Sequence, residues 1–438
     1  MPFTETVQSW GKIAIDSALE YDTPKVVHIK SKKVGFINRL IQIGVIVYVV
    51  VWAIILQKGY QETDEVISAV TTKLKGVAYT NITNHPNLNI EDVTPYNRIW
   101  DPVDYVIPPM MDNAFFVMTN MVITPEQSRG RCAEDPLMYG VRCEDNPDLN
   151  CVKGDPVPNG NGVKTGDCVT YIFPNGSKTK TCEIEAWCPV EYDETPLQNE
   201  AVLAAARNFT VLIKNSVSYR KFNFEKRNIA ESANKSYLTT CRYSTHANPF
   251  CPVFRLEDIV AETGEDFERI AYQGGVVGIF INWDCNLDKN WDDCRPQYSF
   301  RRLDNKEAKI AKGYNFRFGH FYVINDTDYR TLTKAYGILF EVIVTGTAGK
   351  FNFIPLTTNL GAGLALLSIA TVMCDIITFY ILRKGTYYKS KKYLYVENVD
   401  SDEYNKFENE GQSISTATPA RSTNMGPLTA GQPYVDPL

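Results

Sequence analysis

Two lysines two positions apart, Lys73 and Lys75 in the stretch "TTKLKG" (71–76), are residues whose type and spacing could do chemistry. In a β-strand, residues two apart point to the same face, and like charges on one face repel each other unless an anion lies between them. A solvated strand edge, where lysines discourage aggregation, is the alternative interpretation. The six residues alone leave both interpretations open.

Further cations occur in aromatic or strand-like contexts, namely Arg301 and Arg302 in "YSFRRLD" and Lys334 in "RTLTKAYG". Together such residues could bind a polyphosphate. Several must converge on it, because each charge-assisted hydrogen bond contributes only about 1.5 to 3 kcal/mol. Spacing alone does not show whether they converge.

Motifs for enzyme chemistry are missing from the sequence. The stretch "GTAGK" (346–350) lacks the earlier glycine of a phosphate loop, since Val344 stands there, and no Ser or Thr follows Lys350. There is no G-x-S-x-G, no H-E-x-x-H and no dinucleotide-binding fingerprint. We therefore expect a protein that is not an enzyme and needs no cofactor or metal.

The composition predicts a folded chain that does not bind nucleic acid. Its 438 residues are 44% hydrophobic and 22% charged, enough to bury two or three domains' worth of core. The net charge of −6 disfavours a nucleic-acid partner, because that class relies on broad basic surfaces.

Two apolar segments predict a membrane protein. Residues 40–56 hold no charge and would span about 26 Å as a helix, close to the thickness of the hydrocarbon core. Residues 356–382 hold one charge, Asp375, a costly group that should face water or a partner. The late start of the first segment disfavours a cleaved signal peptide.

Basic residues set the predicted orientation. Lysines and arginines cluster before the first span and after the second, which places both termini in the cytoplasm and the protein in the plasma membrane. The predicted parts are a cytoplasmic N-terminus (1–39), a first span (40–56), an extracellular domain (57–355), a second span (356–382) and a cytoplasmic tail (383–438). The tail is polar after about residue 400, which predicts disorder there.

Cysteines and glycosylation sequons agree with this topology. Ten of the eleven cysteines lie between the spans, where disulfides persist, and the lack of C-x-x-C favours five disulfides over a zinc cluster. Six of them fall in residues 130–190, predicted to be a loop-rich subdomain. The five N-glycosylation sequons also lie between the spans, at Asn81, Asn175, Asn208, Asn234 and Asn325.

Short strands dominate the pattern between the spans. Residues 275–283 and 335–344 are typical of strands, whereas helices are expected at 197–207 and 256–272. The fold class is therefore a membrane protein with two transmembrane helices flanking a large β-rich, disulfide-bonded extracellular domain.

Over roughly residues 21–396 the chain resembles the ATP-gated cation channels known as P2X purinergic receptors. The resemblance rests on colinear motifs and on ten cysteines in order. The motifs include "YDTPK", "TTKLKG", "RIWDPVDYVIP", "AWCPVE", "NFTVLIKN", "FNFEKRNI", "NPFCPVFRL", "YSFRRLD", "GYNFRFGHFY", "TLTKAYGI" and "GAGLALLSIATVMCDII".

The resemblance implies a set of ATP-binding residues. Lys73 and Lys75 would bind phosphate, with Arg301 and Lys334 completing a cationic cup and Ser299 beside it. Thr210 would bind the adenine edge and Leu212 the nucleoside, while Leu238 would close the pocket from the neighbouring subunit. The agonist is ATP.

The resemblance also implies an assembly and a mechanism. The family is a homotrimer in the lipid bilayer, with ATP bound between subunits and a non-selective pore for Na⁺, K⁺ and Ca²⁺ lined by the second span. Its gate positions correspond to Thr358, Asn359, Ala362 and Ala365. The implied disulfides are Cys132–Cys188, Cys143–Cys168, Cys151–Cys182, Cys241–Cys251 and Cys285–Cys294.

Other functions remain to be compared with an ATP-gated channel. A two-span channel gated by protons or a peptide shares the topology and the cysteine-rich extracellular domain, and a non-conducting nucleotide receptor would share the binding residues. A two-span ecto-nucleotidase would release phosphate from ATP.

Overall fold

The computed structural model describes residues 32–82, 93–144, 150–173, 175–194, 197, 200–231, 233–381 and 384–392. The chain divides into two compact units, one made of Met1–Gln57 with Thr357–Leu438 and the other of Lys58–Leu356. The motif "YDTPK" and the predicted disordered tail lie outside the described residues.

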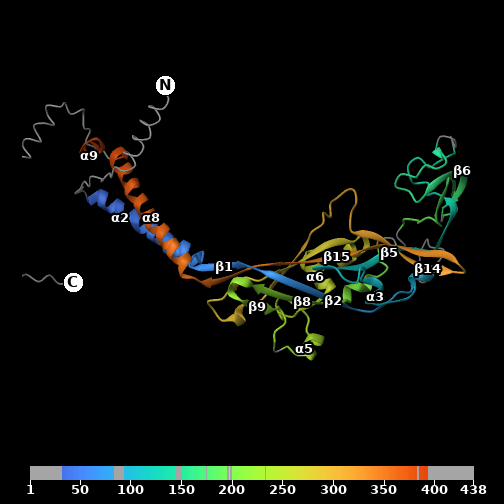
Figure 1. Ribbon diagram of the computed structural model, residues 1–438, viewed down its shortest axis with the longest axis horizontal. Helices are drawn as coiled ribbons and strands as arrows, with labels where there is room; N and C mark the ends of the chain where they lie inside the picture. The colour runs from blue at the N-terminus through green and yellow to red at the C-terminus, as the bar shows by residue number, and fades with distance from the viewer. Residues whose placement is uncertain are drawn as a thin grey trace, which may run out of the picture. The chain divides into compact units, whose positions relative to one another are not determined.

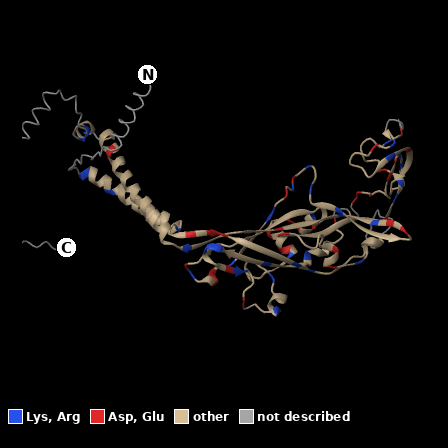
Figure 2. Cartoon of the chain, viewed as in Figure 1, with Lys and Arg blue, Asp and Glu red and all other residues tan. Residues whose placement is uncertain are grey.

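Two long apolar helices dominate the first unit. Helix α2 (Lys32–Val47) continues as the π-helix η1 (Tyr48–Leu56), and α8 (Phe353–Ile376) continues as the π-helix η7 (Ile377–Ile381). Spans of 25 and 29 residues are long and apolar enough to cross a membrane. Figure 2 shows both helices almost free of charged residues along their length. They contain the predicted span 40–56 and the described part of 356–382.

A glycine permits close contact between these two helices. Gly363 of α8 is buried, and a Cβ built there would lie 2.7 Å from Cγ1 of Val49. Any larger residue would push the helices apart, which is how small residues act at membrane-helix interfaces. The side of α8 that carries Gly363, Ala370 and Cys374 is therefore its buried side.

A seven-stranded sheet forms the main body of the second unit (Figure 1). Residues 115–124 in the middle of this sheet are buried on both faces, as expected where a sheet is covered on both sides. The order is β13 (Gln297–Arg302), β11 (Gly275–Asn282), β15 (Thr327–Thr345), β5 (Ala114–Ala133), β7 (Lys178–Cys188) and β6 (Val163–Ile172), with β14 (Asn315–Ile324) pairing β15. The predicted strands 275–283 and 335–344 are confirmed as β11 and part of β15.

Three smaller sheets accompany it. One has the order β10 (Val253–Arg255), β8 (Thr210–Tyr219) and β2 (Ile67–Lys75), with β9 (Phe224–Arg227) pairing β8. The others are β1 (Gln61–Glu65), β16 (Thr347–Phe351) and β12 (Cys285–Asn286), and the pair β3 (Ala78–Tyr79) and β4 (Ile99–Trp100).

The remaining helices are short. In the second unit they are the α-helices α3 (Pro102–Tyr105), α5 (Lys235–Thr240), α6 (Leu256–Glu262) and α7 (Phe267–Gln273) and the 3₁₀ helices η3 (Thr94–Tyr96), η4 (Ala204–Asn208), η5 (Arg220–Phe222) and η6 (Trp291–Asp293). The first unit contains α9 (Gly385–Lys392). Two helices predicted from the sequence differ from those in the structure.

The helix predicted at 256–272 is two helices, because Gly264 between them adopts φ +79°. Of the helix predicted at 197–207, the residues that the structure describes form only the 3₁₀ turn η4 (Ala204–Asn208). There the core overrides alanine's helix propensity, since Ala201, Leu203 and Ala206 are all buried and the Leu203 amide bonds to the Thr119 carbonyl of β5.

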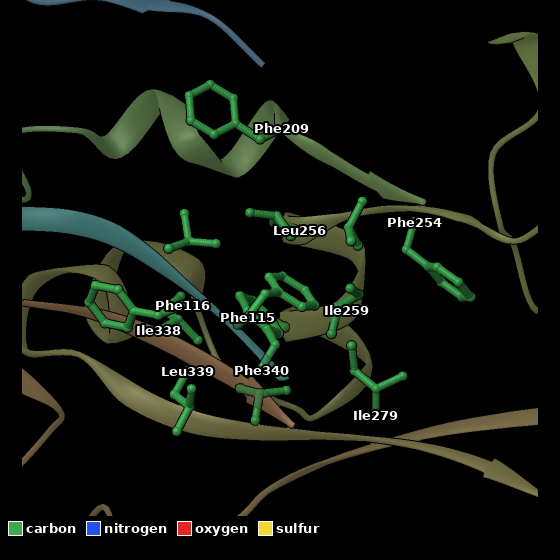
Figure 3. Close-up of a cluster of buried hydrophobic side chains, with 14 of the residues drawn as sticks. Phe115, Phe116, Phe209, Phe254, Leu256, Ile259, Ile279, Ile338, Leu339 and Phe340 are labelled. Atoms are coloured by element: carbon green, nitrogen blue, oxygen red, sulfur yellow. The ribbon is translucent and has the colours of Figure 1, made fainter. Parts of the chain in front are cut away.

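Aromatic and aliphatic side chains from several elements make the core of the second unit. In Figure 3, side chains of β5, β11, β15 and α6 converge on one cluster. Phe115 and Phe340, opposite each other in β5 and β15, stack with ring centroids 4.8 Å apart. This core fixes the strands that carry the residues discussed below.

The cysteine-rich region, 130–190, is less loop-rich than predicted. Its strands β6 and β7 form a hairpin that continues the seven-stranded sheet beyond β5, and it has a small core of its own around Cys151, Cys182 and Ile184. The chain forms the five disulfides that the resemblance implied: Cys132–Cys188, Cys143–Cys168, Cys151–Cys182, Cys241–Cys251 and Cys285–Cys294.

Candidate functional site

The exposed face of β2 and β8 brings together four of the predicted ligand-binding residues. In β2, Lys73 and Lys75 are exposed, and they lie directly opposite Leu212 and Thr210 of β8. Side chains directly opposite on one face have Cβ atoms about 4.5 to 5.5 Å apart. The structure therefore forms one surface from two cations, a hydroxyl and an apolar side chain. The sequence pattern had predicted the shared face of the two lysines, and the resemblance had named Thr210 and Leu212.

Strand alternation produces this surface. Val211 and Ile213, which flank Leu212, are fully buried in the core, so Thr210 and Leu212 must point the other way. Among the residues that the structure describes, no carboxylate forms an ion pair with Lys73 or Lys75. Two unneutralised ammonium groups on one face favour binding of an anion.

Lys334 lies in a second, different setting on the seven-stranded sheet. Its side chain is only 9% exposed, and its Nζ donates hydrogen bonds to both carboxylate oxygens of Asp193, at 2.6 Å for Oδ2. The ammonium also lies 5.0 Å from the centre of the Tyr336 ring. This cation is thus already engaged.

Electrostatics keep Lys334 charged in this buried place. Burial is the largest single cause and lowers the pKa of Lys334. The hydrogen bonds and charge interactions with Asp193 and Tyr336 together outweigh it, so the pKa of Lys334 lies above its ordinary value. The pKa of the Tyr336 hydroxyl is raised as well, and burial is the largest cause of that rise. Lys334 is therefore a fixed positive charge at neutral pH.

Arg317 is a candidate site residue that the sequence reasoning missed. It stands in β14 directly opposite Lys334. Its Nε donates to Oε2 of Glu191 at 2.7 Å, and its Nη2 lies 3.6 Å from Oδ2 of Asp193. Two cations and two carboxylates therefore make one cluster, called here the Lys334 cluster: Lys334, Arg317, Asp193 and Glu191.

A signal for Arg317 was present in the sequence. Arg317 and Lys334 are equidistant from Asn325 and Asp326, the turn of the β14–β15 hairpin, where both residues have positive φ. An Asn-Asp pair between two alternating segments predicts such a tight turn. Counting outward from it would have paired these two cations.

Within one chain, Arg301 and Ser299 lie away from Lys334. Arg301 and Ser299 are exposed on β13, opposite Gly278 and Phe280 of β11. Gly278 in turn lies beside Glu341 of β15, seven residues beyond Lys334. At about 3.3 Å per residue that separation along the strand is about 23 Å, so the chain does not bring Arg301 to Lys334.

Arg301 and its neighbour Arg302 face opposite sides of β13. Arg301 lies 5.7 Å from the centre of the Phe280 ring, whereas Arg302 is largely buried and pairs with Asp304 and Glu265. Arg302 is therefore part of the domain's own ion-pair network, and Arg301 stays a predicted ligand contact.

Leu238 lies on the short helix α5, where it is half-buried. Asn234 caps that helix through its side chain, which accepts from the Tyr237 amide at 2.7 Å. The Cys241–Cys251 disulfide follows at once. All five predicted sequon asparagines, Asn81, Asn175, Asn208, Asn234 and Asn325, are exposed.

Three of the four predicted pore residues share a stripe of α8. Thr358, Ala362 and Ala365 are exposed and follow one another at helical spacing, away from the buried residues Gly363, Ala370 and Cys374. Asn359 is half-buried and turns toward the buried side. The stripe of three is thus exposed on the single chain.

Asp375, the charge inside the second span, has a partner. Lys392 of α9 donates a hydrogen bond from Nζ to Oδ2 of Asp375. This confirms the expectation that so costly a charge would find one.

Comparisons with known proteins show which family this chain is similar to. The family model described as the ATP P2X receptor matches residues 19–395. Mouse P2X purinoceptor 4 is 48% identical over 384 residues, which cover 87% of this chain and 94% of the relative. Human P2X purinoceptor 5 is 41% identical over 420 residues, 95% of this chain and 90% of the relative.

Solved structures agree. The crystal structure of an invertebrate P2X receptor from the Gulf Coast tick, in the presence of ATP and Zn²⁺, matches with a TM-score of 0.74 and 43% identity over 78% of this chain and 99% of that one. The chicken ATP-gated P2X7 receptor channel matches with a TM-score of 0.65 and 37% identity, covering 79% and 98%. This chain belongs to the ATP P2X receptor family.

Proposed function

We propose that this chain is a cation channel opened by extracellular ATP. The observation that carries the proposal is the β2–β8 register, which sets Lys73 and Lys75 beside Leu212 and Thr210 on one exposed face in a chain of this family. Cations attract the phosphates, the hydroxyl of Thr210 offers a hydrogen bond to the adenine edge, and Leu212 packs against the nucleoside.

One triphosphate needs more donors than this face offers, because each charge-assisted bond contributes only about 1.5 to 3 kcal/mol. Lys334 and Arg317 supply two further cations, but on another sheet. We infer that the two groups meet at the boundary between chains of a homotrimer, with Leu238 closing the pocket from the neighbour. Arg301 and Ser299 remain predicted contacts at the same boundary.

Binding of phosphate to the Lys334 cluster must compete with carboxylates already there. Asp193 holds Lys334, and Glu191 holds Arg317. ATP then opens the channel by binding more tightly to the open arrangement than to the closed one. No hydrolysis enters this mechanism, so the chain is not an enzyme and needs no cofactor.

The pore follows from the helices. In the proposed trimer α8 lines the path for Na⁺, K⁺ and Ca²⁺, and the exposed stripe Thr358, Ala362 and Ala365 faces it. Asn359, turned toward the buried side, is the least supported pore residue. Both termini lie in the cytoplasm and the protein in the plasma membrane, in keeping with the basic flanks of the spans.

The test is whole-cell current in cells that express the chain, on application of ATP. Lys73→Ala removes one charge-assisted bond, so the ATP concentration for half-maximal current should rise about 10- to 150-fold. Lys178→Ala, on the exposed part of β7, is the matched control and should leave it unchanged.

Other functions predict other results. A current evoked by protons or a peptide but not by ATP would favour the alternative channel class. ATP binding without current at normal surface expression would favour a non-conducting receptor, and phosphate released from ATP would favour a nucleotidase. An ATP current indifferent to Lys73→Ala would remove the proposed site.

A further inference from the structure

A β-bulge in β5 turns one amide side chain into the sheet interior. Thr124 pairs with Leu332 and Gln127 pairs with Arg330, so two residues of β5 lie opposite Thr331 alone. One of the two, Glu126, has φ +51°. Bulges of this kind re-aim side chains, and here Gln127 becomes 99% buried.

Gln127 uses both ends of its amide. Its Oε1 accepts a hydrogen bond from Nε of Arg330 at 2.7 Å, and its Nε2 donates to the carbonyl oxygen of Pro189 at 2.7 Å. Pro189 stands two residues before Glu191 and four before Asp193. The side chain thus joins β15 to the start of the segment 189–193, called here the acidic segment.

Two further contacts fix the same end of the acidic segment. The Arg330 guanidinium lies 4.9 Å from the centre of the Trp187 ring, and Arg129 lies 5.3 Å from it. Cys188 is bonded to Cys132 of β5. Of these contacts, the hydrogen bond from Gln127 to the Pro189 carbonyl is the one that holds the backbone of the acidic segment itself.

Glu191 depends on this support. It is only 8% exposed, and its Oε1 is buried without a hydrogen-bond partner among the described residues. A buried carboxylate that lacks part of its hydrogen bonding is costly, and the backbone must hold it in place. The acidic segment, once held in place, positions Glu191 beside Arg317 and Asp193 beside Lys334.

We propose that Gln127, together with Arg330, positions the acidic segment so that its carboxylates compete with phosphate for Lys334 and Arg317, and that Gln127 thereby sets the sensitivity of the channel to ATP. This inference rests on the proposed function. Gln127 touches neither cation; it is a positioning residue that acts through Pro189 and the two carboxylates.

Gln127→Met keeps the volume and removes both hydrogen bonds. The looser segment competes less, so half-maximal current should need about 3- to 10-fold less ATP, with unchanged maximal current per receptor at the surface. Thr119→Val is the control, because it removes another buried hydrogen bond of β5, from Oγ1 to the Ala271 carbonyl, far from the acidic segment in the chain. It should not increase ATP sensitivity.

The Asp193→Asn background separates positioning from a general structural effect. If Gln127 acts through the carboxylates, the shift caused by Gln127→Met should shrink when Asp193→Asn has already weakened the competition. Should Gln127→Met fail to reach the surface, Arg330→Lys removes the Nε donor to Gln127 while keeping the charge, and the same increase in ATP sensitivity is expected.

The outcomes are distinguishable. No ATP current from wild-type chain at the surface overturns the proposed function itself. A wild-type ATP current with an unchanged or higher ATP requirement in Gln127→Met and Arg330→Lys overturns this inference alone, as does a shift that persists at full size in the Asp193→Asn background.

Discussion

The two cationic regions of the extracellular domain differ in how they hold their charge. On the β2–β8 face, Lys73 and Lys75 are exposed and no described carboxylate pairs with them. In the Lys334 cluster, the cations are paired, and Lys334 is almost fully buried. The first region can receive an anion directly, whereas the second must exchange one anion for another.

This difference suggests a division of work. In the proposed mechanism, the exposed lysine pair would attract ATP and contribute binding in any state of the channel, which does not by itself shift an equilibrium. Exchange of partners at the Lys334 cluster would release Glu191 and Asp193 from their cations, which would couple ATP binding there to a change within the protein. The largest effects on gating should therefore come from the buried cluster.

We expect the largest difference between the two cationic regions from Lys334→Met. It removes a phosphate contact and leaves Asp193 with only its longer contact to Arg317, so that the carboxylate repels phosphate more strongly. The ATP requirement should therefore rise on the order of 100-fold or more, at least as much as for Lys73→Ala. Concentration–response curves of both variants at matched surface expression check this. A smaller shift for Lys334→Met than for Lys73→Ala would mean that the exposed face carries the binding.

A smaller and opposite effect is expected from Asp193→Asn. The amide no longer competes as a charged partner for Lys334, so half-maximal current should need about 3- to 10-fold less ATP. Asp292→Asn is a suitable control, because that carboxylate lies 3.6 Å from Lys226 in an exposed ion pair. If Asp193→Asn reduced ATP sensitivity, Asp193 would be orienting Lys334 for phosphate instead of competing with it.

The smallest effect concerns stability at alkaline pH. Burial lowers the pKa of Lys334, but its hydrogen bonds and charge interactions with Asp193 and Tyr336 together outweigh burial, so the folded-state pKa lies above the ordinary 10.5. The stabilisation is complete below that ordinary value and is lost as pH rises through the higher folded pKa.

Thermal unfolding of the purified receptor between pH 8 and pH 11 measures this. The difference in Tm between wild type and Lys334→Met should be constant at the lower pH values and shrink at the highest. A gap of equal size across the whole range would show that packing of the lysine stem, and not its charge, stabilises the cluster.

Sequence reasoning was strongest where a local rule decides the outcome. Strand alternation placed Lys73 and Lys75 on one face, and hydropathy located both long helices. It failed where tertiary structure decides, as in the buried segment around Leu203, which forms a 3₁₀ turn in place of a helix. Gly264 was visible as an interruption, but its positive φ decides that one helix becomes two.

The predicted cationic cup of Arg301 and Lys334 also depends on tertiary structure. Arg301 and Lys334 carry the right charge, but the distance between them depends on the pairing of β13, β11 and β15, which the sequence does not display. Asp193 and Glu191 were invisible as partners for a similar reason, since 141 and 126 residues separate them from Lys334 and Arg317. Long-range pairs of this kind come only from the fold.

The Asn325–Asp326 turn sets the register of the two strands that carry the cations of the Lys334 cluster. Arg317 faces Lys334 only because equal numbers of residues separate each of them from the turn. One residue inserted into β14 between Arg317 and the turn would rotate Arg317 to the opposite face of the sheet, whereas two would return it to the original face at a new height. Natural variation in this hairpin should therefore come in even steps, and a single-residue insertion would separate the two cations without altering either one.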